Sequence, residues 1–408
     1  MRVPVAAPSP SLRNDGVLAL NCGSSSIKFA LFDACASPLP RMPGWSGKVD
    51  GITGPAPVYE EAGQPPVALV LDAADPYAGA LAHIRDRLAA CPDGGRLLAV
   101  AHRVVHGGSK YVAPVRMDAT VLADLRGYVP LAPLHQPFAL EAIEALLRLH
   151  PELPQVACFD TAFHHTLPPV EQWLPLPRAL RDRGLRRYGF HGLSYAYLAR
   201  ALDERYGTAA RGRTIAAHLG SGASLCAMRE LRSVATTMGF SALDGLMMGT
   251  RCGALDPGAI LYLLQTQALS VAQLGDLLYH QSGLLGVSGC SSDPRVLLQH
   301  EDQTPVREAL ELYVERIVRE IGGLVATLGG LDLLVFTAGI GEHNATLRAR
   351  VCQRLGYLGI ALDAAANAAH GPLISASGSA VRVAVEPTNE EWIAASAACE
   401  MVRVRPGN

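Results

Sequence analysis

The feature that most constrains the fold is a short strand–turn–strand pattern that occurs twice along the chain. The first copy consists of Val17–Asn21, Cys22–Ser26 and Ile27–Phe32. The second copy consists of Thr214–His218, Leu219–Ser224 and Leu225–Met228. Short apolar runs joined by small residues predict paired strands. Aligning Gly23 with Gly220 places Ser24 on Ser221, and this recurrence indicates a weak internal repeat.

The chain is too long for one ordinary domain, and its composition is that of a globular protein. It has 408 residues, of which 49% are hydrophobic and 18% charged, so we expect two or more well-buried domains. A net charge of −2 without a long run of Lys or Arg predicts no nucleic-acid partner and no anionic membrane surface. The nine cysteines include no C-x-x-C pair and predict reduced thiols in a cytoplasmic enzyme.

Two segments bear on targeting. Residues 1–16 hold three prolines and no apolar block, which predicts a flexible extension and no secretory signal. The window from Ile321 to Gly341 holds one charge, Asp332, and is long enough for a membrane span. However, Gly329 and Gly330 would interrupt a helix there, so we expect a core helix followed by a buried strand.

Strands and helices alternate along the rest of the chain, which predicts an α/β fold. Further strands are expected at Leu97–Val105, Val156–Asp160, Leu333–Thr337 and Val381–Val385. Helices are expected at Tyr77–Ala90, Ala139–Leu149, Tyr195–Tyr206, Ala259–Gln267, Pro305–Leu328 and Asn389–Met401. We expect the boundary between the two halves near residue 160.

The two Gly/Ser turns favour a phosphate site, because small residues expose backbone N–H groups and hydroxyls add donors. Lys28 adds a cation two positions beyond Ser26, on the same strand face. One such turn alone would be interpreted as a plain hairpin turn. Two such turns together with Lys28 favour phosphate binding. No P-loop motif occurs, and a third Gly-rich loop at Gly339–Asn344 lacks the last glycine of a dinucleotide fingerprint.

Two arginines are candidates for binding anions. Strand alternation places Arg103 and Val105 on one face, which suits a small carboxylate with a short hydrocarbon tail. A structural ion pair is the alternative for Arg103. Arg251 stands between Gly249 and Gly253, where the backbone can approach a ligand closely.

Acidic residues and histidines form the other candidate set. Asp160 follows a predicted strand end, where ligand sites of α/β sheets lie. Glu390 and Glu391 stand at a predicted helix start, where favourable interaction with the helix dipole would also explain them. His135 and His191 each adjoin apolar residues and could equally be satisfied core histidines.

Several separated motifs together resemble the acetate kinase family of the actin-like ATPase superfamily, from Val17 to the final helix. They are Asn21-x-Gly-Ser-Ser-Ser-x-Lys28, His102-Arg103-Val-Val-His-Gly-Gly108, Leu131-Ala-Pro-Leu-His135, Phe159-Asp-Thr-Ala-Phe-His164, Arg187-Tyr-Gly-Phe-His191-Gly, His218-Leu-Gly-x-Gly222, Met247-Met-Gly-Thr-Arg251, Thr337-Ala-Gly-Ile-Gly-Glu342 and Thr388-Asn-Glu-Glu391. The resemblance implies two actin-like (ribonuclease H-like) domains with a cleft between them. The implied domains are 17–160 plus 392–408 and, for nucleotide binding, 161–391, after the extension at 1–16.

The resemblance also implies an activity. It is the reversible Mg²⁺-dependent transfer of a phosphoryl group from ATP to acetate, giving acetyl phosphate and ADP, with Mn²⁺ as a possible substitute. A cytoplasmic homodimer with no nucleic-acid or membrane partner is expected. A propionate kinase, acting on another short-chain carboxylate, is the alternative within the family. A non-catalytic actin-like nucleotide switch is the alternative from another class.

The resemblance assigns roles residue by residue. For catalysis it implies Arg103, Asp160, His191 and Arg251, with His191 and Arg251 stabilising the transition state. For the substrate it implies Asn21, Arg103, Val105, Leu134, His135 and Phe190. For ATP it implies Ser24, Ser26, Lys28, His218, Gly220, Ser221, Gly222, Asp293, Arg295, Gly339, Ile340, Gly341 and His343. For the metal it implies Asn21 and Glu390.

Four positions depart from the family pattern. The family usually has Asn at Ser221, His at Tyr195 and Asn at His343. Ala242 stands where a proline commonly lines the acyl pocket, so the pocket is expected to leave more room for the acyl chain.

Overall fold

The computed structural model describes residues 15–90, 95–133 and 135–403, and the chain divides into two compact units. Unit 1 extends to Ala162 and resumes at Asn389, and unit 2 is Phe163–Thr388. Nearly all of the extension expected at 1–16 lies outside the described residues. The first strand begins at Gly16.

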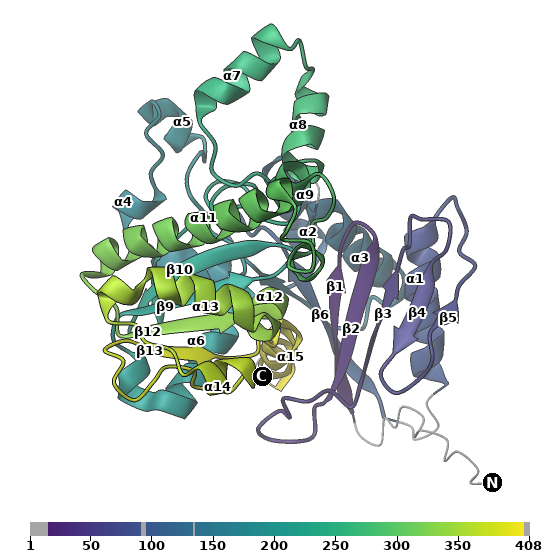
Figure 1. Ribbon diagram of the computed structural model, residues 1–408. Coiled ribbons are helices and arrows are strands. Elements are labelled where there is room, and N and C mark those ends of the chain that lie inside the picture. Colours follow the sequence, from purple (N-terminus) through teal and green to yellow (C-terminus); the bar gives the residue numbers. More distant parts are fainter. Residues whose placement is uncertain (1–14, 91–94, 134, 404–408) are drawn as a thin grey trace, which may run out of the picture. The chain divides into compact units, whose positions relative to one another are not determined.

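Within its described residues, unit 1 is built on an eight-stranded mixed sheet in the order β5-β4-β3-β2-β1-β6-β8-β7 (Figure 1). Its strands are β1 (Gly16–Cys22), β2 (Ser26–Asp33), β3 (Trp45–Asp50), β4 (Val58–Glu61), β5 (Val67–Ala68), β6 (Leu97–Val104), β7 (Val115–Arg116) and β8 (Gln155–Phe159). β1 to β5 form an antiparallel meander. β6 pairs parallel with β1, and β8 pairs parallel with β6.

Within its described residues, unit 2 is built on a five-stranded mixed sheet in the order β11-β10-β9-β12-β13. Its strands are β9 (Thr214–Leu219), β10 (Ala223–Arg229), β11 (Arg232–Thr236), β12 (Leu333–Thr337) and β13 (Arg382–Val385). β9 to β11 are antiparallel, whereas β12 is parallel to β9 and β13 is parallel to β12.

The central strands of the two sheets share one topology. In both units a three-stranded antiparallel meander continues, beside its first strand, into two parallel strands. The order β3-β2-β1-β6-β8 in unit 1 therefore corresponds to β11-β10-β9-β12-β13 in unit 2. The two predicted strand–turn–strand segments are β1–β2 and β9–β10, at equivalent places, so the weak internal repeat is confirmed as a duplicated sheet topology.

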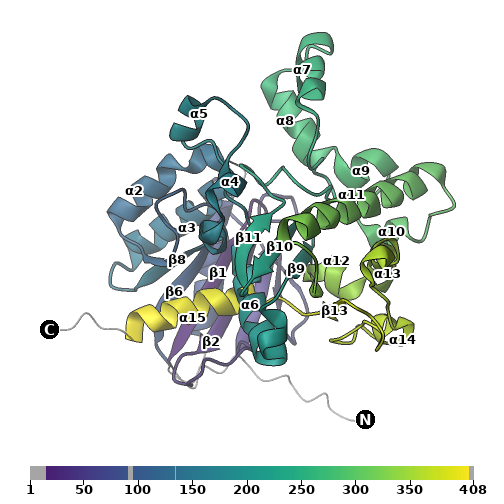
Figure 2. The ribbon, with the colours of Figure 1, turned by 90° about the vertical axis from the view of Figure 1, so that its left-hand side faces the viewer.

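Helices cover both faces of the unit 1 sheet. They are α1 (Pro76–Ala89), α2 (Ala119–Gly127), α3 (Gln136–Leu149) and α15 (Glu390–Arg403), with a 3-10 turn at Val129–Leu131. Ala157 of β8 packs in the core beside α2 and α3, whereas the next residue, Cys158, contacts the carbonyl of Ala394 in α15. Successive strand residues face opposite sides, so α15 covers the face opposite to α2 and α3 (Figure 2).

Unit 2 contains most of the remaining helices. They are α4 (Pro169–Gln172), α5 (Arg178–Asp182), α6 (Gly192–Tyr206), α7 (Pro257–Thr266), α8 (Val271–His280), α9 (Gly283–Ser288), α10 (Pro294–Leu297), α11 (Thr304–Leu328), α12 (Ala338–His343), α13 (Ala345–Arg354) and α14 (Ala364–Ala368). Short 3-10 turns lie at Ala162–Thr166, Gly207–Ala210 and Gly356–Leu358. Tyr195, Leu198 and Leu202 of α6 pack in one core cluster with residues of β9, β10 and β12.

The apolar window around Gly329 contains a core helix followed by a strand, as expected. α11 ends at Leu328, and Gly329 takes the left-handed conformation with φ 71°, which favours glycine at a helix end. β12 then begins at Leu333 and is buried throughout. Among the described residues, we find no helix that is both long and apolar enough to cross a membrane.

The other predicted elements are present, with ends shifted by up to three residues. One of these shifts moves a predicted site residue out of its strand. The strand expected at Leu97–Val105 ends at Val104, because the backbone turns there. The N–H of His106 donates to Gln136 Oε1 at 3.0 Å instead of to a neighbouring strand. Gly108 then takes a positive φ of 64°. Val105 therefore lies just beyond β6.

The expectation of a loop at Gly339–Asn344 is wrong, because this segment forms the short helix α12. Two glycines in six residues disfavour a helix by about 1 kcal/mol each, which is why the sequence pattern predicts a loop. Tertiary contacts override that propensity. The buried guanidinium of Arg348 donates to the carbonyls of Gly341 and Glu342 at 2.8 and 2.7 Å, and so satisfies the end of the helix.

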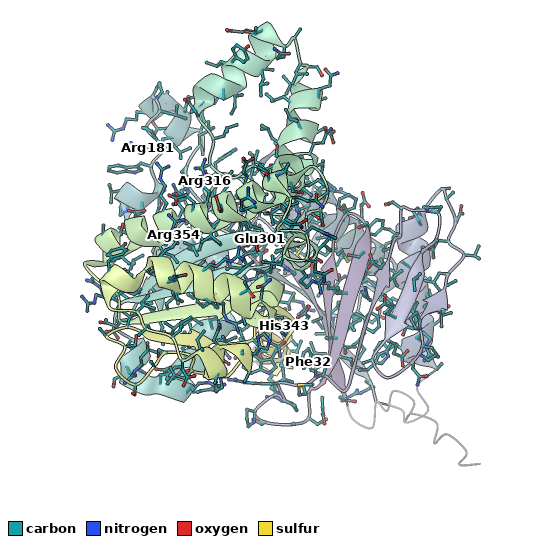
Figure 3. All side chains as sticks on the ribbon, in the orientation of Figure 1. Phe32, Arg181, Glu301, Arg316, His343 and Arg354 are labelled. Carbon is teal, nitrogen blue, oxygen red and sulfur yellow. The ribbon has the colours of Figure 1, made fainter. Side chains whose placement is uncertain are left out.

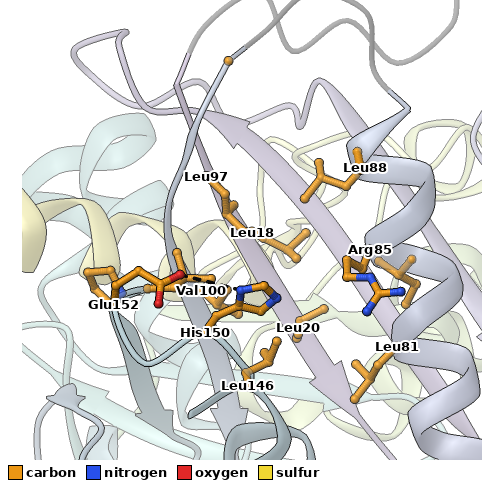
Figure 4. Close-up of a pocket in the computed structure, with 15 residues that line it drawn as sticks. Leu18, Leu20, Leu81, Arg85, Leu88, Leu97, Val100, Leu146, His150 and Glu152 are labelled. Atoms are coloured by element: carbon orange, nitrogen blue, oxygen red, sulfur yellow. Dashed lines mark ion pairs between the residues drawn. The ribbon is translucent and has the colours of Figure 1, made fainter. Parts of the chain in front are cut away.

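An apolar cavity of about 440 Å³ lies in unit 1, on the face of the sheet that α1 and α3 cover (Figure 4). Leu18 and Leu20 of β1 line it, together with leucines of α1 and α3. Asn21 points to the opposite face, because side chains alternate along the strand. The sheet therefore separates this cavity from the site residues predicted on β1 and β6.

Candidate active site

In unit 1, Arg103 lies between two carboxylates. Its Nε donates to both oxygens of Asp160 at 3.1 and 3.0 Å, and its Nη2 donates to Asp160 Oδ2 at 2.7 Å. Its Nη1 is 2.5 Å from Glu390 Oε2. Arg103 is on β6, Asp160 follows β8, and Glu390 begins α15, so neighbouring strands and the helix that covers them bring the three side chains together.

These three groups carry one positive and two negative charges in a largely buried place. The side chains of Arg103, Asp160 and Glu390 are 20%, 3% and 12% exposed. Burial raises the pKa of Glu390 to about 7, and the charges of Asp160 and Glu391 add to this effect against the opposing effect of Arg103. Burial by itself would lower the pKa of Arg103, but the two carboxylates hold it well above its ordinary value. The cluster therefore has an excess of negative charge that a cation could balance.

The first Gly/Ser turn lies beside this cluster. Asn21 pairs with Lys28 across β1 and β2, and Leu20 is in register with His102 across β1 and β6. Asn21 and Arg103 are the next residues after this pair, one on each of the two neighbouring strands. Gly23 N–H donates to Ser26 O at 2.8 Å, which closes the turn and leaves Ser24 exposed. Lys28 is also exposed.

The other predicted substrate-binding residues are divided between the units. In unit 1, Val105 is half-buried beyond β6 and His135 precedes α3, while Leu134 lies outside the described residues. In unit 2, Phe190 is buried, and its carbonyl accepts a hydrogen bond from His164 Nε2 at 2.9 Å.

In unit 2, two of the predicted histidines are stacked. His191 precedes α6 with a positive φ of 58°, and its ring lies 4.1 Å from that of His218 at the end of β9, with 14° between the planes. His191 Nδ1 is 2.8 Å from Ser224 Oγ, and His218 Nδ1 is 2.9 Å from Ser194 Oγ. Both rings are therefore held at Nδ1 by a buried serine.

Arg251 and His191 meet at Gly222. A Cβ atom placed on Gly222 would lie 2.9 Å from His191 Nε2 and 3.7 Å from Arg251 Nη1. Arg251 Nη1 donates to the carbonyl of Ala242 at 3.1 Å, and no carboxylate pairs with Arg251 among the described residues. Burial lowers the pKa of Arg251. A half-buried cation without a carboxylate partner among the described residues, beside an imidazole and a glycine, is suited to bind a phosphate oxygen.

The second Gly/Ser turn adjoins the start of α12. Gly220 N–H donates to Gly222 O at 3.0 Å, and Ser221 at the tip of the turn is exposed. A Cβ atom on Gly220 would lie 3.5 Å from the Cβ of Ala338. Thr337, which precedes α12, is buried, and its Oγ1 has no hydrogen-bond partner among the described residues.

The remaining predicted ATP residues lie on α12 and at α10. Gly339, Ile340 and Gly341 belong to α12, and His343 ends it with a side chain that is 73% exposed (Figure 3). Asp293 caps α10 and pairs with Arg295, whose Nη2 is 2.6 Å from Asp293 Oδ2.

Unit 1 provides oxygen donors that fit Mg²⁺. No group of three or more His, Cys, Asp or Glu side chains in the described ranges could hold a metal ion. Mg²⁺, however, is usually held by one or two carboxylates together with substrate phosphates and water. Glu390, at the start of α15, provides one such carboxylate, which is 12% exposed and pairs with Arg103 through Oε2.

The sequence reasoning missed the serines that hold the two histidines. Ser194 and Ser224 are fully buried, although serine is mostly an exposed residue. Tyr195 was identified only as a departure from the family, yet its hydroxyl lies 2.6 Å from Ser224 Oγ. Ser224 could have been found from strand pairing, since it lies directly opposite His218 in the β9–β10 hairpin.

Comparison with known proteins agrees with the motifs. Residues 16–396 match the model of the acetokinase family. The chain is 50% identical over 388 residues to an acetate kinase of Rhodopseudomonas palustris, covering 94% of this chain and 97% of that one. Among solved structures, it matches an acetate kinase of Porphyromonas gingivalis at 34% identity, covering 95% and 99% of the two chains with a TM-score of 0.84. It also matches a propionate kinase of Francisella tularensis at 32% identity, covering 94% and 98% with a TM-score of 0.83.

Proposed function

Because the chain belongs to the acetokinase family, we propose that it is an acetate kinase, an ATP:acetate phosphotransferase that works in both directions. ATP and acetate are converted to ADP and acetyl phosphate. The observation that carries this assignment within the molecule is Arg251, a half-buried arginine with no carboxylate partner among the described residues, beside His191 and Gly222.

The reaction needs little proton chemistry. Acetate is ionised at neutral pH, so the acceptor oxygen requires no general base. What the enzyme must supply is positioning of the reactants and compensation of the charge on the transferring phosphoryl oxygens. Arg251 and His191 would contact those oxygens. Asp160 would hold the guanidinium of Arg103 in place for the carboxylate.

Binding of ATP and the acyl group would use the other predicted residues. We assign the phosphates to the two Gly/Ser turns, with Ser24, Ser26 and Lys28 in unit 1 and Gly220 in unit 2. The remaining contacts of unit 2 with the nucleotide are His218, Ser221, Gly222, Asp293, Arg295, Gly339, Ile340, Gly341 and His343. Val105, Leu134 and Phe190 would contact the acyl group, and His135 would be a further substrate contact near the transferring phosphoryl group.

Glu390 and Asn21 would hold Mg²⁺, which Mn²⁺ could replace. A bound Mg²⁺ compensates negative charge on the phosphate oxygens. Burial raises the pKa of Glu390 to about 7, and a bound cation would lower it again by favouring the ionised carboxylate.

The acid that the enzyme prefers can be measured directly. Incubation with ATP, Mg²⁺ and a series of C2 to C4 acids, followed by trapping of acyl phosphate with hydroxylamine, should give the highest kcat/KM with acetate. Propionate should follow closely, because one methylene is worth about 1–3 kcal/mol in such a pocket and Ala242 replaces a bulkier proline. Equal or better use of propionate would assign the chain as a propionate kinase instead.

A nucleotide switch without catalysis is the alternative from a different class. It would bind ATP and form no acyl phosphate with any acid. The presence of Arg103, Asp160, His191, Arg251 and Glu390 supports the enzyme, since a switch would not need the complete set.

We further propose that the enzyme is a homodimer that associates through α7 and α8. α7 is apolar yet has no buried residue, and Leu261, Tyr262 and Val271 are 55%, 57% and 80% exposed. The two helices stand away from the rest of unit 2 (Figure 1), and a second copy would cover them. Replacing Leu261 and Tyr262 by Glu should give a monomer in light scattering, whereas a monomeric wild type would overturn the proposal.

The free thiols of the described cysteines support a cytoplasmic location.

A further inference from the structure

A chain of hydrogen bonds runs from the phenol of Tyr195 to the ring of His191. The hydroxyl of Tyr195 is 2.6 Å from Ser224 Oγ, and Ser224 Oγ is 2.8 Å from His191 Nδ1. Tyr195 and Ser224 are both fully buried, so water does not compete for these bonds. His191 Nε2, at the other end of the ring, faces Gly222 beside Arg251.

The protons of this chain have one consistent arrangement. The phenol of Tyr195 has a single proton to donate to Ser224 Oγ, and burial keeps this proton in place because it raises the pKa of Tyr195 well above its usual value. Ser224 in turn donates its own proton to His191 Nδ1. A ring nitrogen that accepts a hydrogen bond carries no proton, so the proton of the neutral ring is on Nε2.

The opposite arrangement would leave a buried donor unsatisfied. If His191 carried its proton on Nδ1, Ser224 Oγ would accept from both His191 and Tyr195. Its own hydroxyl proton would then have no acceptor at a fully buried position, which costs about 1–3 kcal/mol. This difference corresponds to a preference of roughly tenfold to hundredfold for the proton on Nε2.

We propose that Tyr195 and Ser224 are positioning residues that fix His191 in the Nε2–H form, so that Nε2–H donates to a phosphoryl oxygen. The inference rests on the proposed function, in which His191 contacts the transferring group. It also gives a role to Tyr195, which stands where the family usually has His. The stacking of His191 on His218 fixes the plane of the His191 ring, and the hydrogen bonds from Tyr195 through Ser224 fix its proton on Nε2.

The test is the protonation state of the two ring nitrogens of His191, measured by ¹⁵N NMR on histidine-labelled protein. The resonances are assigned by their loss in His191→Gln. In the wild type, Nε2 should appear protonated and Nδ1 unprotonated. Ser224→Ala should mix or invert the two forms and lower kcat about tenfold or more, with KM changed by less than about twofold. Ser224→Thr retains the hydroxyl and should restore both readouts.

Two further variants act as controls. Ser194→Ala removes the equivalent serine from His218 and should leave the His191 tautomer unchanged. Tyr195→Phe keeps the serine and provides a second test if Ser224→Ala fails to fold; it should weaken the Nε2–H preference without inverting it.

A wild-type His191 protonated on Nδ1, or an unchanged tautomer in Ser224→Ala, would overturn the proposal that Tyr195 and Ser224 fix the tautomer of His191. Full kcat in His191→Gln would overturn the proposed role of His191 instead, independently of the NMR result.

Discussion

Replacing Glu390 by Gln should stabilise unit 1 at pH 8 although it removes the proposed metal ligand. The pKa of Glu390 is raised from 4.5 to about 7 by burial, with Asp160 and Glu391 adding to the effect. Between these two values the unfolded chain has lost the proton while the folded protein keeps it. The folded state therefore binds more protons, and the free energy of unfolding falls as the pH rises through this window.

The size of this effect follows from the shift. Each pKa unit corresponds to about 1.4 kcal/mol, so the ionised carboxylate costs the folded protein about 3 kcal/mol above pH 7. Gln has the shape of the neutral acid and carries no charge, and Arg103 keeps its three hydrogen bonds to Asp160. We expect Glu390→Gln to match the wild type near pH 4.5 and to exceed it by up to about 3 kcal/mol at pH 8.

The assay is urea unfolding between pH 4.5 and 8, in EDTA and without nucleotide, because a bound cation would stabilise the ionised form. Tryptophan fluorescence reports mainly on unit 1, since Trp45 and Trp392 are 5% and 7% exposed there, whereas Trp173 of unit 2 is 51% exposed. Glu391→Gln, one residue further along the helix, is the matched control: it removes a charge that only adds to the shift, so its free energy of unfolding should still fall as the pH rises, by less than in the wild type. Parallel curves for the wild type and Glu390→Gln, or a less stable variant at pH 8, would refute the reasoning.

The other predictions concern the two arginines and Gly222. Arg251→Lys should fold normally, as judged by circular dichroism, and lose orders of magnitude in kcat, because a point charge replaces a planar fork; near-normal turnover would contradict its role. Gly222→Ala should lower kcat about tenfold or more, because its Cβ would lie 2.9 Å from the ring of His191, whereas Gly275→Ala, with no atom within 4 Å, should not. Arg103→Met should cost about 3–5 kcal/mol at pH 8 by leaving two buried carboxylates without their partner. Urea unfolding should show a smaller loss at pH 5, and a loss independent of pH would argue against the ion cluster.

The sequence by itself determined the local elements and the chemical types in the site. Short apolar runs and small turn residues defined both hairpins, β1–β2 and β9–β10, because strand pairing across a short turn depends on neighbouring residues. The end of α11 at Gly329 was equally local, since only glycine takes that conformation without strain. The motifs also identified Arg103, His191 and Arg251 from the sequence alone.

Tertiary structure decided which of these groups act on one another. Arg103 meets Asp160 and Glu390 only because β6 adjoins β8 and because the chain returns to unit 1 as α15. The helix α12 forms against its own propensity because Arg348, from the next helix, satisfies its carbonyls. Ser224 holds His191 across 33 positions of sequence. Sequence patterns report the preferences of neighbouring residues, whereas burial, charge compensation and the placement of a proton depend on residues that only the folded chain brings together.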